Sequence, residues 1–150
     1  MNRVITLFIA ITAALVLALG SSAQAASHCR VLRVTKSCTE YDFTAGSFCT
    51  ITSSNIEAIR PGSRIVYRSA LGDPTPGVLD SDLVIDGPHH NDVFGHVVLD
   101  GSTLTGVVML SGGTGRFVHF HAGPLRVACP DYPICTWTGP LGSHHRRTTG

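Results

Sequence analysis

The sequence predicts an all-β fold, a closed antiparallel β-barrel of about eight strands, preceded by a signal peptide. From residue 29 onward, short runs rich in β-branched and aromatic residues recur along the chain, and such residues favour strands. Turn residues separate these runs roughly every 8–12 positions, a spacing typical of antiparallel barrels and sandwiches. Closure into a barrel is favoured because it leaves no exposed sheet edge.

The N-terminus has the three parts of a secretory signal peptide. Arg3 is followed by an apolar run of 16 residues, Val4–Leu19, and then by Ala23-Gln24-Ala25. This order predicts cleavage after Ala25 and a secreted or periplasmic protein. The run is short for a membrane span of about 20 residues, and no later run is long enough, so no span is expected in the mature chain. Residues 26–142 then form one barrel domain, and residues 143–150 a disordered polar tail.

The charge balance argues against a nucleic-acid partner. The sequence holds 11 Lys and Arg and 10 Asp and Glu; loss of Arg3 with the signal peptide leaves 10 of each. No basic stripe exists that would neutralise phosphates.

The five cysteines all follow the cleavage site, so export should oxidise them. Cys129 and Cys135 enclose a short loop with two prolines, which suits a local disulfide. Cys38 and Cys49 flank a turn-like segment and form the next most plausible pair. Cys29 is then left over, either free or exchanging with Cys38. A zinc site is less favoured, because no C-x-x-C pair occurs.

The first half of the domain begins with two predicted strands, Cys29–Lys36 and Phe48–Thr52. An S-x-x-E pattern ending at Glu57 predicts a short helical turn over residues 55–59, which Arg60-Pro61-Gly62 ends. Arg64–Ala70 is the next strand. Gly72–Gly77 is a loop, because its two prolines cannot donate to a strand ladder.

The second half continues with short strands, and Asp100-Gly101-Ser102 is a hairpin signal within it. Residues 86–92 form a further loop. The expected strands are Leu79–Ile85, Phe94–Leu99, Leu104–Leu110, Phe117–Ala122, Leu125–Ala128 and Cys135–Thr138.

A glycine-rich break, residues 111–115, joins two apolar runs and predicts a hairpin. On its returning strand, Phe117, His119 and His121 would share one face, because side chains alternate along a strand.

Several segments together resemble the allene oxide cyclase and dirigent barrel superfamily, in particular small secreted bacterial members. Ser111–Phe117 (SGGTGRF) is similar to the G-G-T-G-[KR]-F turn of that superfamily. The similar segments that precede it are Ser47–Ile59 (SFCTITSSNIEAI), Gly62–Tyr67 (GSRIVY), Leu79–Asp82 (LDSD) and Gly95–Asp100 (GHVVLD).

This resemblance implies a barrel of about eight strands with a mostly apolar interior. Characterised relatives hold a reactive hydrophobic intermediate there and steer its cyclisation or coupling without a cofactor, often as trimers. No catalytic residue of the plant cyclases matches a position here, so none is carried over.

The histidines raise the question of a metal site. With a third ligand such as His96 or Asp100, His119 and His121 would suit Zn²⁺, Cu²⁺ or Fe²⁺. The glutamate and the later histidine of a cupin site are missing, however, so we favour surface histidines and expect neither metal nor cofactor. His96 is either a general base at a pocket mouth or, as we favour, a hydrogen-bonded structural residue. The pair His89-His90 lies in a loop that we expect to be solvated.

Arg116 and the carboxylates of Asp80 and Asp82 are expected to form an ion pair that ties the hairpin to a strand.

We therefore expect a secreted, disulfide-bonded barrel that binds a small apolar ligand or has a structural role. It is expected to be a module rather than an enzyme, and able to form a homo-oligomer. The alternative is a cofactor-free cyclase or isomerase acting in the barrel lumen. Polar residues beside an open apolar cavity would favour the enzyme, and a lumen plugged by aliphatic side chains the module. The candidate ligand-binding residues are Tyr67, His96, Phe117, His119 and His121.

Overall fold

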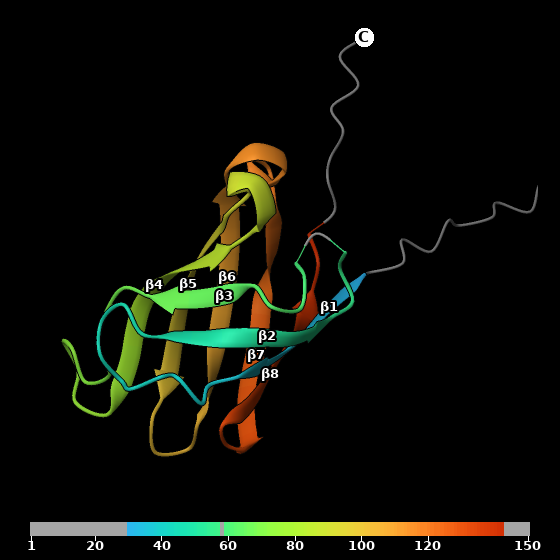
Figure 1. Cartoon of the computed structure of the whole chain (residues 1–150). Coiled ribbons are helices and arrows are strands. Elements are labelled where there is room, and N and C mark those ends of the chain that lie inside the picture. The colour runs from blue at the N-terminus through green and yellow to red at the C-terminus, as the bar shows by residue number, and fades with distance from the viewer. Residues whose placement is uncertain (1–29, 58, 143–150) are drawn as a thin grey trace, which may run out of the picture.

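Eight strands form one closed antiparallel barrel in the computed structural model, which describes residues 30–57 and 59–142 (Figure 1). Each strand pairs with the next, and β8 returns to pair with β1. The predicted fold class is confirmed. The predicted signal peptide, the polar tail and Cys29 lie outside the described residues. The strands are β1 (Val31–Ser37), β2 (Phe48–Ser54), β3 (Arg64–Tyr67), β4 (Val78–Asp86), β5 (Val93–Asp100), β6 (Thr105–Gly113), β7 (His121–Asp131) and β8 (Ile134–Pro140).

The barrel interior follows from the alternation of side chains along each strand. On β1, Leu32, Val34 and Lys36 are buried, whereas Val31 and Arg33 are exposed. Trp137 of β8 lies opposite Val34 and is fully buried. The same alternation on the other strands fills most of the lumen with aliphatic side chains, so the core lies inside the barrel.

The two ends of the barrel carry different connections (Figure 1). Four hairpin loops, which join β1 to β2, β3 to β4, β5 to β6 and β7 to β8, lie at the lower and left end of the view. Hydrogen bonds link these loops in pairs: Gly101 N donates to Gly77 O at 2.8 Å, and Cys38 N donates to Pro133 O at 2.8 Å. The opposite end carries two short 3₁₀ helices, η1 (Pro88–His90) and η2 (Gly115–Phe117). We call the first end the loop end.

The helical turn predicted over residues 55–59 is wrong, since residues 55–57 and 59 are bends and turns. Ser54 Oγ accepts a hydrogen bond from Ile56 N at 3.1 Å. Asn55 reaches across to β1, where its side chain accepts from Arg33 N at 2.8 Å and donates to Val31 O at 2.7 Å. These local and cross-strand hydrogen bonds compete with a helix for the same polar groups.

The returning strand of the glycine-rich hairpin also differs from the prediction. Residues 117–120 form a tight turn rather than a strand, because Phe117 and Phe120 both bury their rings, 5.4 Å apart in an edge-to-face pair. Burial of two large aromatic side chains outweighs the two-residue alternation. The two strands predicted over residues 117–128 are instead one, β7, and a register shift lets it continue through Gly123 and Pro124.

Two disulfide bonds, Cys38–Cys49 and Cys129–Cys135, hold the loop end. These are the predicted pairs. The two bridges are neighbours, with Cys38 Sγ 4.0 Å from Cys135 Sγ. Each bridge closes its own hairpin, Cys38–Cys49 that of β1 and β2 and Cys129–Cys135 that of β7 and β8, and the two hairpins are in contact at these sulfur atoms.

Removal of the Cys129–Cys135 bridge in the double variant Cys129→Ala/Cys135→Ala is expected to lower the free energy of unfolding by roughly 2–3 kcal/mol, on the chain-entropy model. Denaturant unfolding measures this loss. Cys38→Ala/Cys49→Ala is the matched control and should cost slightly more, because that bridge spans 11 residues rather than 6. Non-reducing peptide mapping that found free thiols at Cys129 and Cys135 would contradict the pairing.

Candidate functional site

A pocket of about 50 Å³ opens into the barrel at the loop end. Its walls are mostly apolar, and both disulfides contribute to them. The side chains that line it are Leu71, Leu79, Val97, Leu99, Leu104 and Val127, the aromatic residues Tyr41, Phe43, Tyr67 and Tyr132, the four paired cysteines, and Lys36.

Lys36 is the one lysine in the whole sequence, and it lies inside the barrel with 4% of its surface exposed. It follows Leu32 and Val34 on the inward face of β1, so the strand carries its amine into the lumen. Its Nζ donates a hydrogen bond to the Tyr67 hydroxyl and lies 3.8 Å from Cys49 Sγ. The amine also lies 5.0 Å from the ring centroid of Tyr67 and 4.9 Å from that of Trp137.

The surroundings of Lys36 disfavour its charged form. None of the described residues that line the pocket is an aspartate or glutamate. Burial therefore lowers the pKa of Lys36 from 10.5 to about 7. The two aromatic rings offset part of this cost through cation–π contact. At neutral pH the amine is thus present both as a cation and as a neutral nucleophile.

Tyr67 ends β3 and is 2% exposed. Because its oxygen accepts the hydrogen bond from Lys36, its own O–H remains to donate to another group. Burial, together with the neighbouring Tyr41, raises the pKa of Tyr67, so the phenol keeps its proton at neutral pH. Lysine and tyrosine therefore place an amine and a hydroxyl donor side by side in the pocket.

The loop between β1 and β2 covers the pocket with aromatic side chains. The Tyr41 ring lies 5.1 Å from the Tyr67 ring and 5.1 Å from the Phe43 ring, in edge-to-face contacts. Phe43 stacks on Tyr132 at 6.4 Å and is 44% exposed. The hydroxyl of Tyr41 is buried and finds no hydrogen-bond partner among the described residues. Burial raises the pKa of Tyr41 to about 12.

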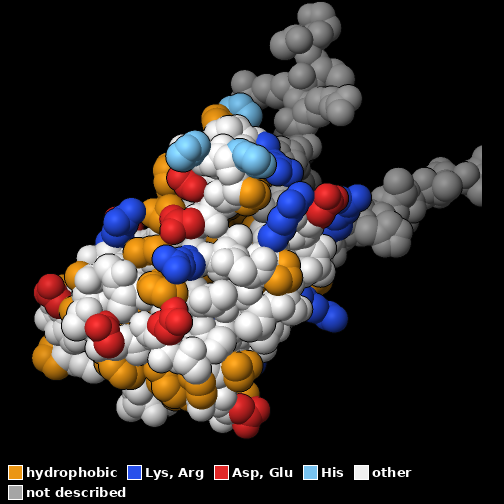
Figure 2. All heavy atoms as spheres, viewed as in Figure 1, with side chains coloured by type: hydrophobic (Ala, Val, Ile, Leu, Met, Phe, Trp, Pro, Cys, Tyr) orange, Lys and Arg blue, Asp and Glu red, His pale blue; other side chains and the backbone are white. Residues whose placement is uncertain are grey.

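The structure does not bring the five predicted ligand-binding residues together. Tyr67 lines the pocket, but Phe117 is buried near the opposite end against Phe120. His119 and His121 are exposed, and the strand that would have aligned them is not formed. Histidine side chains gather at the end that carries η1 and η2, whereas apolar side chains gather along the loop end (Figure 2). Within residues 30–57 and 59–142, no three His, Cys, Asp or Glu side chains lie in an arrangement for a metal ion.

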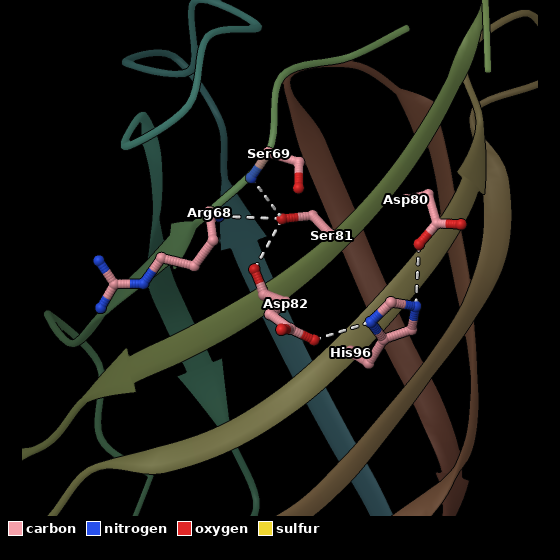
Figure 3. A network of polar contacts seen from close by, with 6 residues as sticks. All are labelled: Arg68, Ser69, Asp80, Ser81, Asp82 and His96. Carbon is pink, nitrogen blue, oxygen red and sulfur yellow. Dashed lines mark hydrogen bonds and ion pairs between the residues drawn. The ribbon is translucent and has the colours of Figure 1, made fainter. Parts of the chain in front are cut away.

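His96 lies on the outer surface of β5, between two carboxylates of β4 (Figure 3). Its Nε2 is 3.1 Å from Asp80 Oδ1, and its Nδ1 is 3.0 Å from Asp82 Oδ1. The predicted pairing of these carboxylates with Arg116 is wrong. Asp80 and Asp82 share one face of β4, as their alternating positions require, and that face meets His96 across the strand pair. Arg116 lies instead in η2, where its backbone N donates to Asn91 Oδ1 at 2.9 Å.

Ser81, between the two aspartates, faces the barrel interior and closes the adjoining loop (Figure 3). Its hydroxyl accepts from Arg68 N and Ser69 N, both at 2.9 Å, and donates to Asp82 O at 2.6 Å. The hydroxyl of Ser81 and both ring nitrogens of His96 thus find polar partners within the protein.

The sequence carries a signal for the inward position of Lys36. Residues 29–36 alternate between apolar and basic residues, and this pattern suggests that every basic side chain among them faces outward. Lys36, however, stands in step with Leu32 and Val34 rather than with Arg33. Strict two-residue counting from Leu32 would have placed the amine in the lumen.

Comparisons of the chain with protein-family models, with curated proteins and with solved structures found no match. No helix within residues 30–57 and 59–142 has the length and apolar character needed to cross a membrane. Function is therefore inferred from the geometry of the pocket.

Proposed function

We propose that this protein binds a small, mostly apolar molecule in the pocket at the loop end, with Lys36 and Tyr67 holding the molecule's one polar group. The observation that carries the proposal is the burial of the chain's one lysine beside an apolar cavity. Ligand pockets combine apolar walls with a few polar groups that fix orientation, and this pocket has that composition.

The cost of burying Lys36 supports a role beyond packing. A buried amine without a carboxylate partner destabilises a fold, and an apolar side chain of similar size would pack there at lower cost. A ligand that accepts hydrogen bonds from Lys36 and Tyr67 would offset this cost. The unpartnered hydroxyl of Tyr41, a residue of the same pocket, would gain a partner in the same way.

The size of the pocket limits the ligand. The cavity volume of about 50 Å³ is only a few times the roughly 10–15 Å³ that a cavity needs to admit one water molecule. A molecule with a few non-hydrogen atoms fits as the loops stand. A longer apolar tail would need the aromatic cover of Tyr41 and Phe43 to move outward.

A cofactor-free isomerase or cyclase is the second candidate. Lys36 has a pKa near neutrality and lies against a phenol that keeps its proton, so the two could act as general base and general acid. A polar pair beside an apolar cavity is the arrangement that favours an enzyme over a plugged barrel. The closed eight-strand barrel supports the proposed kinship with the allene oxide cyclase and dirigent superfamily.

Export also belongs to this proposal. Two disulfides support an oxidising compartment, secreted or periplasmic. Assembly into a homo-oligomer stays a prediction.

Binding is tested by titrating the folded protein with butanoate, butanone and 1-butanol while recording amide chemical shifts. At least one probe should shift the signals of Lys36 and Tyr67, with a dissociation constant on the order of millimolar for so few atoms. Val97→Phe should fill the pocket and weaken binding at least about tenfold, because Val97 lines it and is 2% exposed.

Val98→Phe is the matched control, since Val98 is the next residue of β5 and faces outward with 45% exposure. It should leave binding unchanged, and thermal melts should show both variants folded. If all three probes fail to shift pocket signals, or if both variants bind as the wild type does, the proposed binding site is wrong.

A further inference from the structure

We infer that Lys36 is a nucleophile that captures a small apolar aldehyde or ketone as an imine, with Tyr67 as the proton donor to the carbonyl oxygen. This inference rests on the proposed function and specifies the ligand as a carbonyl compound that binds covalently.

The position of Lys36 suits nucleophilic attack rather than structural ion pairing. Its amine lines the pocket, and the polar groups that line the pocket beside it are the hydroxyls of Tyr67, Tyr41 and Tyr132. The four cysteines there are bound in disulfides and do not titrate. A lysine desolvated in an apolar pocket keeps a reactive neutral fraction near neutral pH, and the lowered pKa of Lys36 agrees with this geometry.

Tyr67 supplies the proton donor that activates the carbonyl group. The hydroxyl accepts from Lys36 Nζ, which leaves its own proton to donate to a carbonyl oxygen bound next to the amine. Tyr41, whose ring lies 5.1 Å from that of Tyr67, lines the same pocket with a second hydroxyl that has no partner among the described residues. A carbonyl compound would thus find a nucleophile and a hydrogen-bond donor in contact with each other.

The reaction balances without an oxidant or reductant. The lone pair of Nζ forms a bond to the carbonyl carbon, and the π electrons move to oxygen, which takes the proton from Tyr67. The nitrogen of this carbinolamine loses a proton, which restores the phenol. Tyr67 then protonates the carbinolamine hydroxyl, and the C–O bond breaks as the nitrogen lone pair forms the C=N bond, so that water departs. The remaining N–H proton passes from nitrogen to the Tyr67 oxygen, which restores the phenol. Overall, the amine gives two hydrogens and the carbonyl gives its oxygen. Apolar walls favour this condensation, because they exclude the water that would reverse it.

A carboxylate ligand, bound to the protonated form of Lys36, is the competing chemistry. A bound carboxylate requires Lys36 to stay protonated, and burial of Lys36 away from any protein carboxylate disfavours the protonated form. The carbonyl compound uses the neutral form and also uses the hydroxyl donors beside it.

The test is reductive trapping of the full, folded protein with butanal and cyanoborohydride at pH 7, followed by peptide mapping. One butyl group should appear on Lys36, at least roughly tenfold faster than on the N-terminal amine, which is the reference for an exposed amine. Because the sequence holds one lysine, the site of labelling is unambiguous. Labelling in denaturant should lose this advantage.

Two variants sharpen the result. Lys36→Met should remove the internal label and leave that of the N-terminus. Tyr67→Phe should slow labelling of Lys36 by roughly a hundredfold, as loss of a general acid does, whereas Val98→Phe should not change it. Equal rates at Lys36 and at the N-terminal amine would overturn the inference.

The non-covalent titration separates this inference from the proposed function. Shifts at Lys36 and Tyr67 with butanone or 1-butanol, but no faster trapping of butanal, would overturn the imine and leave the binding site standing. Binding of butanoate alone would also overturn it, because Lys36 would then act as a cation. Absence of both binding and trapping would overturn both proposals.

Discussion

Replacing Lys36 with methionine is expected to raise the free energy of unfolding at pH 7 by roughly 2–4 kcal/mol. Methionine has a similar length, carries no charge and fills irregular apolar spaces. It therefore removes the cost of holding an amine among Tyr67, Trp137 and the disulfides. Urea unfolding of the two proteins measures the difference. A less stable Lys36→Met variant would mean that the hydrogen bond to Tyr67 contributes more than burial of the amine costs.

The same residue should make stability depend on pH. Burial lowers the pKa of Lys36 to about 7 in the folded state, whereas an unfolded lysine keeps 10.5. Between these values the unfolded chain binds more protons, so the free energy of unfolding rises with pH. We expect a gain of about 2 kcal/mol between pH 7 and pH 9, and this gain should be absent in Lys36→Met.

The paired cysteines, Tyr41 and Tyr67 do not interfere in that range. The paired cysteines do not titrate, and the pKa of Tyr41 is raised to about 12 and that of Tyr67 is also raised, so both phenols keep their protons. Surface histidines are present in both proteins, and the difference between the two pH curves removes their contribution. Parallel curves for the wild type and Lys36→Met would show that Lys36 does not change its protonation on folding.

The fold was predictable because it depends on local patterns that act in the same direction. Two-residue alternation predicted most strands, the Asp100-Gly101-Ser102 signal predicted the hairpin between β5 and β6, and the cysteine spacings predicted both disulfides. The Asp100 carboxylate accepts hydrogen bonds from Ser102 N and Thr103 N within that turn, at 2.7 and 3.0 Å. Short-range hydrogen bonds of this kind join residues that are close in the sequence, so the sequence predicts them directly.

The pocket was less predictable because it depends on how distant segments meet. Tyr67 is one of the predicted ligand-binding residues, but its partner Lys36 is 31 positions away and belongs to another strand. His119 and His121 were attractive for their spacing, yet the Phe117–Phe120 contact, a tertiary effect, removes the strand on which that spacing depends. Side-chain chemistry alone favours His119 and His121 as residues of the functional site, whereas strand alternation favours Lys36.

Gly113→Ala is expected to be the most destabilising single change in the glycine-rich turn, with a loss of about 3 kcal/mol or more in the free energy of unfolding. A Cβ at Gly113 would lie 2.0 Å from the backbone oxygen of Asp92 and 2.8 Å from Phe117 Cβ. That oxygen accepts from Thr114 N at 2.9 Å, and Gly113 pairs with Val93 across the ladder. The atom that obstructs the new Cβ is therefore a backbone oxygen fixed by this hydrogen bond and by the strand pairing. Removing the clash requires β5 and β6 to separate.

Gly112 is the matched control, because it is the preceding residue and has a positive φ of 84° without the obstruction. Its nearest neighbour to a new Cβ is Val118 O at 3.6 Å, an ordinary contact. Gly112→Ala should thus cost about 1 kcal/mol, the cost of a left-handed backbone without glycine.

At Gly115 the obstruction is Asn91 Oδ1 at 2.1 Å, a side-chain atom that can move, so the stability loss of Gly115→Ala should fall between those of the other two variants. Thermal melts give the order, and equal losses in all three variants would mean that φ, and not the contact with Asp92, sets the requirement for glycine. Full stability in all three, with a selective loss of ligand binding, would instead place the binding site in this turn.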